Sequence, residues 1–279
     1  ARTVEDAAAA LTVLAGPDPH DSTSVADPVP DYARALERGV EGVRFGIARE
    51  YLPPDLDAEV RVALERCVER LRAEGASVEE IALPHAPHAI PTYYLVATSE
   101  ASSNLARYDG VKYGSRAAGD GDLRRMYAAT RGRGFGPEVK RRVLLGTFAL
   151  SSGYVEAYYG RALRVRSLLR RDFDEAFRRV DLVLGPTSPF PAFRLGEKVD
   201  DPFQMYLCDV FTVTANLVGL PAVSVPAGFT SDRHAAPGLP IGLQVLGPPL
   251  AEAACLRAAA TIERTCGVRG RAPALVPAG

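Results

Sequence analysis

The sequence has 279 residues, of which 47% are hydrophobic and 24% are charged, and its formal net charge is −1. This composition is typical of a globular protein and excludes a fibrous or largely disordered chain. A net charge near zero gives no general attraction to nucleic acid. No apolar run approaches the roughly 20 residues that span a bilayer, and no signal-peptide pattern is present. We therefore expect a cytoplasmic protein without membrane contact.

The cysteines and histidines are few and scattered. The four cysteines are Cys67, Cys208, Cys255 and Cys266. They form no CxxC pair, and three of them fall in expected helices, so we interpret them as reduced core residues. His85 and His88 have the spacing of a ligand pair. They lack the further ligands that a metal site needs, so no metal is expected.

The first third of the chain predicts a βαβ unit preceded by helices. The expected elements are helices at 4–15 and 31–37, a strand at 43–48, an amphipathic helix at 56–73 and a strand at 78–83. Thr3, followed by acidic residues, has the features of an N-cap for the first helix. Apolar and polar residues alternate in the two expected strands. In the 56–73 segment, apolar residues recur every three or four positions, which is typical of an amphipathic helix. A strand, a helix and a strand in this order favour a parallel pair.

The rest of the chain mixes helices with short apolar strands. We expect helices at 93–108, 123–130, 203–218 and 251–264, a long helical pattern at 137–180 with a bend near 151–153, and strands at 181–184, 222–225 and 241–246. Arg131–Gly134 is expected to break the helical pattern because it holds two glycines. Gly185–Pro189 follows a strand, which is where sites lie in α/β sheets.

The familiar catalytic motifs are missing from the sequence. It has no G-x-S-x-G elbow, no P-loop, no G-x-G-x-x-G after a strand and no zinc pattern. Ser151–Gly153 lies in a helical run, so we interpret it as helix packing rather than as a nucleophile. Four histidines in the whole chain argue against a Ser-His-Asp triad. The residues themselves indicate an α/β enzyme-like domain and leave its reaction open.

Several blocks of the sequence resemble one family. They include Ser99–Gly114, Gly134–Tyr154, Leu184–Pro189, Asp201–Pro202, Met205–Tyr206, Asn216–Pro221 and Pro240–Gln244. Together they resemble the A subunits of the bacterial glutamyl-tRNA(Gln)/aspartyl-tRNA(Asn) amidotransferases, within the amidase signature family. The resemblance runs from Ala1 to about Cys266 and covers most of the chain.

This resemblance implies an α/β fold with a mixed β-sheet core wrapped by helices. Residues 1–279 are then expected to be the C-terminal portion of a single amidase domain. Ala1 leads directly into a helix signal, so the chain is expected to lack the N-terminal part of the fold. The family's Ser-cisSer-Lys triad is expected upstream of Ala1, so no catalytic residue is expected within 1–279.

The resemblance also implies a reaction and its partners. Such A subunits hydrolyse glutamine, and the ammonia travels to a B subunit. There, tRNA-bound glutamate or aspartate is activated with ATP and magnesium and then amidated. A small C subunit stabilises the complex of the A and B subunits. No cofactor is expected in the glutamine-hydrolysing subunit itself, and tRNA is expected to bind mainly to the B subunit.

Three residues match the family's substrate-binding positions. Arg142 is implied to bind the α-carboxylate of glutamine, Asp209 its α-ammonium group, and Tyr93 a third part of the substrate. An arginine fork suits a carboxylate, and a carboxylate suits an ammonium group. Each residue also has a simpler interpretation, because Arg142 could be a solvated helix residue, Asp209 a cap or solvent-facing group, and Tyr93 a core residue. Phe190 and Thr214 depart from the family's usual residues and are expected to reshape the pocket.

Two alternative functions remain open. A stand-alone amidase of the same family would act on another small amide, although such a substrate gives Arg142 and Asp209 no charged groups to bind. A non-catalytic scaffold would bind a partner subunit or glutamine without hydrolysing it.

Overall fold

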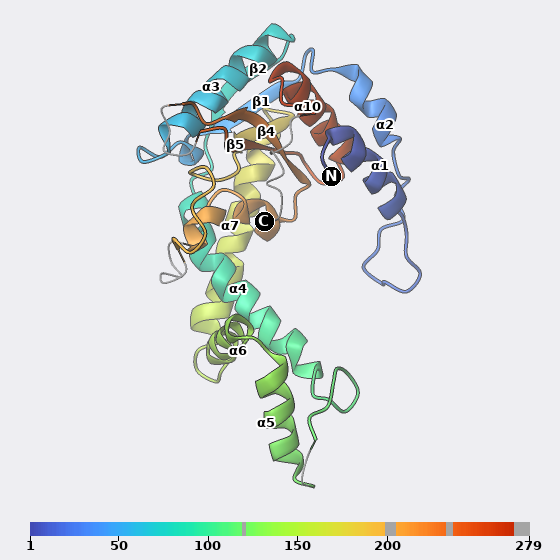
Figure 1. The fold of residues 1–279 in the computed structure, drawn as a ribbon, viewed down its shortest axis with the longest axis vertical. Helices are drawn as coiled ribbons and strands as arrows, with labels where there is room; N and C mark the ends of the chain where they lie inside the picture. Colours follow the sequence, from blue (N-terminus) through green and yellow to red (C-terminus); the bar gives the residue numbers. More distant parts are fainter. Residues whose placement is uncertain (119–120, 199–204, 233–236, 271–279) are drawn as a thin grey trace, which may run out of the picture. The chain divides into compact units, whose positions relative to one another are not determined.

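The computed structural model describes residues 1–118, 121–198, 205–232 and 237–270 (Figure 1). The chain divides into two compact units. The larger unit comprises Ala1–Pro87 and Leu169–Gly279, and the smaller unit comprises His88–Leu168. The expectation of a single domain over residues 1–279 stays a prediction. Asp201–Pro202 and the start of the helix expected at 203–218 lie outside the described residues.

The larger unit is built on a mixed sheet with the strand order β2–β1–β3–β5–β4. Its strands are β1 (Arg44–Ala48), β2 (Ser77–Ile81), β3 (Leu182–Pro186), β4 (Ala222–Phe229) and β5 (Pro240–Leu246). β1 is parallel to both β2 and β3, whereas β5 is antiparallel to β3 and β4. The predicted parallel pair, the α/β class and the mixed sheet are therefore confirmed.

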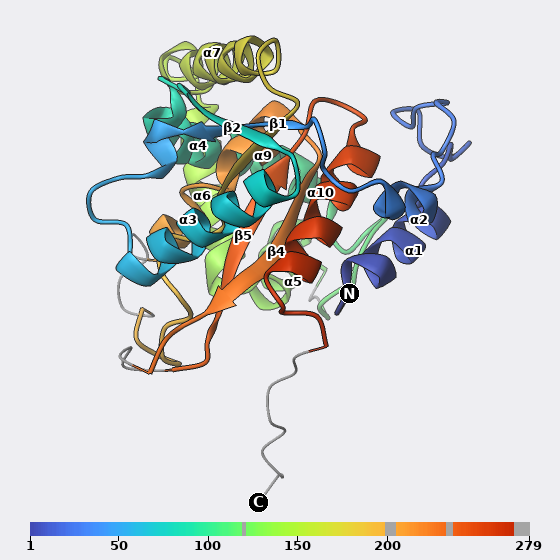
Figure 2. The ribbon, with the colours of Figure 1, turned by 90° about the horizontal axis from the view of Figure 1, so that it is seen from above.

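Helices cover this sheet. α3 (Ala58–Ala73) and α10 (Glu252–Thr265) pack on its strands, and Figure 2 shows them beside β4 and β5. α1 (Val4–Leu14) and the short α2 (Tyr32–Ala35) pack against α10. The N-cap prediction is confirmed, because Thr3 accepts from the backbone of Asp6 and Asp6 accepts from the backbone of Thr3. This reciprocal capping box satisfies two N–H groups that the first turn leaves unpaired.

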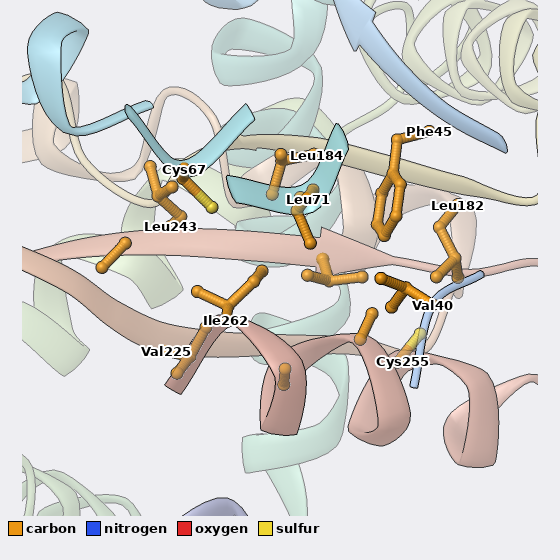
Figure 3. Packing of buried hydrophobic residues seen from close by; sticks show 14 of the residues in the cluster. Val40, Phe45, Cys67, Leu71, Leu182, Leu184, Val225, Leu243, Cys255 and Ile262 are labelled. Carbon is orange, nitrogen blue, oxygen red and sulfur yellow. The ribbon is translucent and has the colours of Figure 1, made fainter. Parts of the chain in front are cut away.

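One apolar cluster joins α3 and α10 to a single face of the sheet (Figure 3). Its members include Leu64 and Leu71 from α3, Leu182 and Leu184 from β3, Leu243 from β5 and Ile262 from α10. Burying each such side chain contributes about 1.5–3 kcal/mol. Side chains alternate along a strand, so Val183, between the two leucines of β3, points to the opposite face. That face carries the polar network described below.

The smaller unit is helical. It contains α4 (Ala89–Asn104), α5 (Leu123–Gly134), α6 (Pro137–Ala149) and the π-helical turn Glu156–Gly160, and α7 (Arg161–Ala176) contributes residues to both units. Figure 1 shows α4 and α6 side by side. A Cβ on Gly146 of α6 would lie 1.9 Å from the carbonyl oxygen of Thr98 in α4. Only glycine permits this approach of the two backbones.

Two of the sequence predictions for the helices are wrong in detail. Arg131–Gly134 does not break the helix, because α5 continues to Gly134. Glycine costs a helix only about 1 kcal/mol, and Arg131 donates hydrogen bonds to the carbonyls of Leu105 and Tyr108, which hold the last turn. The pattern at 137–180 is broken rather than bent, because α6 ends at Ala149 and a turn that includes Gly153, at φ 84°, follows it. The π-helical turn Glu156–Gly160 then continues directly into α7.

The helix expected at 203–218 is also interrupted. Its described part contains a 3₁₀ turn, Leu207–Asp209, and the short helix α9, Val213–Val218. Gly219 ends α9 in the left-handed conformation, as its position before Pro221 predicts. None of the helices in the described part of the chain combines the length and the apolar character needed to cross a membrane.

Candidate substrate-binding site

Arg142 lies on α6 and pairs with a carboxylate one turn earlier. Its Nε donates to Glu138 Oε1 at 2.9 Å, an i,i+4 contact, and Arg141 Nη1 donates to Glu138 Oε2 at 2.7 Å. The Arg142 side chain is 32% exposed, against 50% for Arg141. The hydrogen bond to Glu138 is the main cause that raises the pKa of Arg142 above its usual value. The guanidinium is therefore charged and half-buried.

Tyr93 meets Arg142 from the neighbouring helix. The Tyr93 side chain on α4 is half-buried, and its interaction with the Arg142 side chain raises the pKa of Arg142 further. The ring of Tyr94 lies 5.9 Å from the guanidinium carbon and packs edge-on against Tyr93. The structure thus brings together two of the three predicted site residues, and the close approach at Gly146 holds their helices in contact.

This arrangement retains binding capacity for an anion. A guanidinium carries five N–H donors, and the contacts to Glu138 and Tyr93 use only part of them. Arg141 and Arg142 share the single charge of Glu138, so the local charge stays positive. A half-buried arginine with donors to spare can bind a carboxylate in a bidentate manner.

Asp209 lies in the larger unit, at the end of the 3₁₀ turn Leu207–Asp209. It is exposed, and its backbone carbonyl accepts from the amide and the hydroxyl of Thr212. Within the described ranges, its carboxylate forms no hydrogen bond or ion pair. An exposed carboxylate on a turn fixed by its backbone can accept hydrogen bonds from a cationic ligand group.

A buried glutamine connects this segment to the loop after β3. Gln244 of β5 is 3% exposed, and its amide donates to the carbonyl of Pro186 at 3.0 Å and to that of Phe211 at 2.9 Å. Both amide hydrogens are used, so the side chain has one orientation. Gln244 therefore fixes the segment of Asp209 relative to the end of β3.

A pocket of about 220 Å³ lies beside this segment. Its lining includes Thr187 and Ser188 from the loop predicted to carry a site, together with Phe190 and Cys208. Thr187 Oγ1 lies 2.8 Å from Ser224 Oγ, and the Lys198 ammonium lies 3.9 Å from the ring centre of Phe190. Phe190 does line a pocket, and the pocket offers hydroxyl groups and an aromatic wall to a small polar ligand.

A buried polar contact in the larger unit was not predicted from the sequence. The hydroxyl of Tyr51, which is 1% exposed, lies 2.7 Å from Thr214 Oγ1. Because Thr214 donates its own proton to the carbonyl of Phe211 at 3.2 Å, Tyr51 is the donor of this hydrogen bond. Burial raises the pKa of the Tyr51 phenol. A Cβ on Gly185 would lie 2.6 Å from the Tyr51 ring. Thr214, a residue unusual at this position in the family, was the one sequence feature that pointed to this contact. Its partner Tyr51 lies 163 positions away in the sequence and could not be identified from it.

His85, one of the two histidines with the spacing of a ligand pair, contacts a buried carboxylate. Both the backbone N–H and the Nδ1 of His85 lie 2.8 Å from the carboxylate of Asp172, which is 6% exposed. This contact satisfies a buried charge. In the described part of the chain, no three His, Cys, Asp or Glu side chains gather as metal ligands would.

Comparison with known proteins agrees with the fold and the sequence pattern. The family model described as Amidase matches residues 1–256. The A subunit of the glutamyl-tRNA(Gln) amidotransferase of Myxococcus xanthus is 55% identical over 263 residues, which cover 94% of this chain and 53% of that protein. The same subunit of Moorella thermoacetica is 53% identical, with 98% of this chain and 55% of that protein covered. The chain spans about half the length of these curated relatives.

Solved structures show the same architecture. The crystal structure of the A subunit of the glutamyl-tRNA(Gln) amidotransferase from Thermotoga maritima matches with a TM-score of 0.72 and 37% identity, covering 94% of this chain and 51% of that one. A bacterial aryl acylamidase of the amidase signature family matches with a TM-score of 0.70 at 22% identity, covering 95% of this chain and 51% of that one. At that identity the likeness concerns the fold alone.

Proposed function

This chain belongs to the amidase family, and on that premise we propose that it is the substrate-binding part of the glutamine-hydrolysing A subunit of a tRNA-dependent amidotransferase. The names of the relatives at 53–55% identity support this function. The observation that carries it is the packing of Arg142 on α6, which is hydrogen-bonded to Glu138, beside the edge-to-face pair Tyr93 and Tyr94 on α4. It joins a charged, half-buried arginine and a tyrosine at positions that the family's pattern implies for glutamine.

Each of the three residues has a proposed role in binding glutamine. Arg142 binds the α-carboxylate, and Tyr93 orients the guanidinium and contacts the substrate. Asp209 binds the α-ammonium group through its exposed carboxylate. A simple amide lacks both charged groups, so this set of residues favours glutamine over the substrates of a stand-alone amidase.

The chemistry requires groups beyond these three. We propose that a Ser-cisSer-Lys triad outside residues 1–279 cleaves the amide and that the released ammonia is consumed by a B subunit. That subunit would use ATP and magnesium to convert Glu-tRNA(Gln) or Asp-tRNA(Asn) to the amidated form, braced by a C subunit. The complex would serve protein biosynthesis in the cytoplasm.

Ammonia release from glutamine tests this function. A complete subunit that contains these residues and spans the full length of the relatives is expected to release ammonia from glutamine in the presence of its partner subunits. The 279-residue chain by itself is expected to release none. Turnover by the 279-residue chain would place the nucleophile within it. A complete subunit that hydrolyses other amides but not glutamine would favour the stand-alone amidase.

A further inference from the structure

The net charge of −1 is the sum of two units of opposite charge. The smaller unit, His88–Leu168, holds 13 arginines and lysines against 6 aspartates and glutamates, so its net charge is +7. The larger unit holds the other 20 basic and 28 acidic residues, and its net charge is −8. Such an asymmetry within one chain is typical of a protein that binds a polyanion through its basic part. The charge of the whole chain, which predicted no attraction to nucleic acid, therefore describes neither unit.

Only part of the positive charge of the smaller unit is neutralised by nearby carboxylates. Glu138 forms ion pairs with Arg141 and Arg142. Asp122 lies 3.8 Å from Arg125. In the described part of the smaller unit, six further cations are exposed and form no ion pair, namely Lys112, Arg124, Arg133, Lys140, Arg161 and Arg164. Such cations are available to bind phosphate groups.

Five of the cations lie where the loop at 105–116, which follows α4, packs on α5. Arg131 Nη1 donates to the carbonyls of Leu105 and Tyr108 at 2.9 and 3.2 Å, and Figure 1 shows the loop beside α5. Arg124 lies two helical turns before Arg131, on the same face of α5. We call this surface the basic patch, and its cations are Arg107, Lys112, Arg116, Arg124 and Arg131.

The loop is held in place by its own hydrogen bonds. Asp109, the one carboxylate at 105–116, accepts from the backbone N–H groups of Val111 and Lys112 at 2.8 and 3.3 Å. Arg116 Nε donates to the carbonyl of Gly110. The carboxylate thus fixes the turn, and the side chain of Lys112 stays exposed. A fixed loop loses little conformational freedom when it binds a ligand.

Two exposed tyrosine rings accompany these charges. Tyr108 and Tyr113 are 44% and 43% exposed. The guanidinium carbon of Arg107 lies 4.6 Å from the ring centre of Tyr113, and Arg107 donates to the Tyr113 hydroxyl at 3.4 Å. Proteins use exposed aromatic rings beside arginines to stack unpaired bases while the cations contact phosphates. An acidic protein or a lipid surface offers negative charge without bases, so the two rings favour RNA.

We propose that the smaller unit binds RNA through the basic patch, with its cations on phosphate groups and with Tyr108 and Tyr113 stacked on unpaired bases. Structured RNA exposes such bases in its loops and ends, whereas duplex DNA keeps them paired. This binding belongs to the chain itself and is separate from the tRNA binding expected of a B subunit. It does not depend on glutamine hydrolysis, so either proposal can fail alone.

Fluorescence anisotropy of a labelled tRNA transcript tests the basic patch. The 279-residue chain is titrated into the transcript at several KCl concentrations. We expect a Kd of about 1–100 μM at physiological salt. The logarithm of the association constant should fall linearly with the logarithm of the salt concentration, because phosphates that bind the patch release their counterions.

A pair of double variants locates the binding. Lys112→Glu with Arg124→Glu should weaken binding by about tenfold or more and make the salt dependence shallower by about two phosphate contacts. The matched control, Arg38→Glu with Arg66→Glu, makes the same charge change at exposed residues of the larger unit. It should change the Kd and the salt dependence little. Equal weakening by the two double variants would overturn the proposal, because binding would then follow net charge alone.

A tyrosine variant separates stacking from charge. Tyr113→Leu keeps the charge and an apolar side chain, so it should weaken binding about fivefold or more and leave the salt dependence unchanged. Circular dichroism checks that each variant folds. If one does not, ultraviolet cross-linking of the wild-type chain to the transcript decides, and the linked peptides should contain Tyr108 or Tyr113. Cross-links confined to the larger unit would overturn the proposal, and so would binding to phosphatidylserine vesicles without binding to the transcript.

Discussion

Gly146 of α6 and Thr98 of α4 touch through their backbones, since a Cβ on Gly146 would lie 1.9 Å from the carbonyl oxygen of Thr98. A carbonyl in the middle of a helix cannot move aside as a flexible side chain can. We therefore expect Gly146→Ala to force α4 and α6 apart and to lower the free energy of unfolding by about 1–3 kcal/mol. Urea denaturation followed by circular dichroism measures this loss.

Gly132 provides the control for that substitution. It also lies within a helix, α5, but nothing lies within 4 Å of the Cβ that alanine would add. Alanine is the better helix former, so Gly132→Ala should raise stability by about 0.5–1 kcal/mol. If Gly146→Ala and Gly132→Ala changed the unfolding free energy in the same way, the α4–α6 contact would not depend on the absence of a side chain at Gly146.

The buried hydroxyl pair of Tyr51 and Thr214 is suited to a double-mutant cycle. Thr214→Val leaves the Tyr51 hydroxyl without its acceptor and should cost about 1–3 kcal/mol of unfolding free energy. Thr214→Ser keeps the acceptor and should cost less. The double variant Tyr51→Phe with Thr214→Val removes both polar groups, so its loss should be smaller than the sum of the two single losses. Additive losses would show that the two hydroxyls act independently.

Asp181 gives the larger unit a pH-dependent contribution. The Arg44 side chain donates to it at 2.8 Å and is the main cause that lowers the pKa of Asp181 below its usual value. A carboxyl group with a lowered folded-state pKa stabilises the fold above its unfolded pKa of about 3.9, and this stability is lost as the pH falls through the folded-state pKa. Both side chains are about half exposed, so solvent limits the effect to about 1 kcal/mol or less.

Urea titrations at two pH values measure this contribution. The difference in unfolding free energy between the wild type and Asp181→Asn should be largest near neutral pH and should shrink at about pH 3. Asp55→Asn removes an exposed carboxylate of the same charge and should show no comparable change. A difference between wild type and Asp181→Asn that stays constant with pH would mean that the Arg44 contact does not depend on the charge of Asp181.

Local sequence signals predicted much of the fold. The capping residue Thr3, the apolar alternation of β1 and the amphipathic spacing of α3 each have a local cause, and all three elements form where expected. The errors arose where tertiary contacts decide the outcome. Arg131 stabilises the last turn of α5 by hydrogen bonds to backbone carbonyls more than twenty positions earlier in the sequence. No local sequence pattern predicts such a contact.

The candidate site was less predictable than the fold. Nothing in the sequence distinguishes Arg142 from the neighbouring Arg141, because both can pair with Glu138 from the same helix. Arg142 differs from Arg141 in its surroundings, because the packing of α6 against α4 places Tyr93 and Tyr94 beside Arg142. The positions came from resemblance to a family, and the structure adds the contacts that give these residues a physical role.

The most direct test of the glutamine site compares Arg142→Ala with Arg141→Ala in the complete protein, using glutamine and an amide that lacks the α-carboxylate. Arg142→Ala should raise KM for glutamine by an amount equivalent to about 2–5 kcal/mol, because it leaves a buried substrate carboxylate unpaired. It should change KM for the second amide little, and Arg141→Ala should affect neither substrate strongly. If Arg142→Ala raised KM equally for the two amides, Arg142 would not bind the α-carboxylate of glutamine.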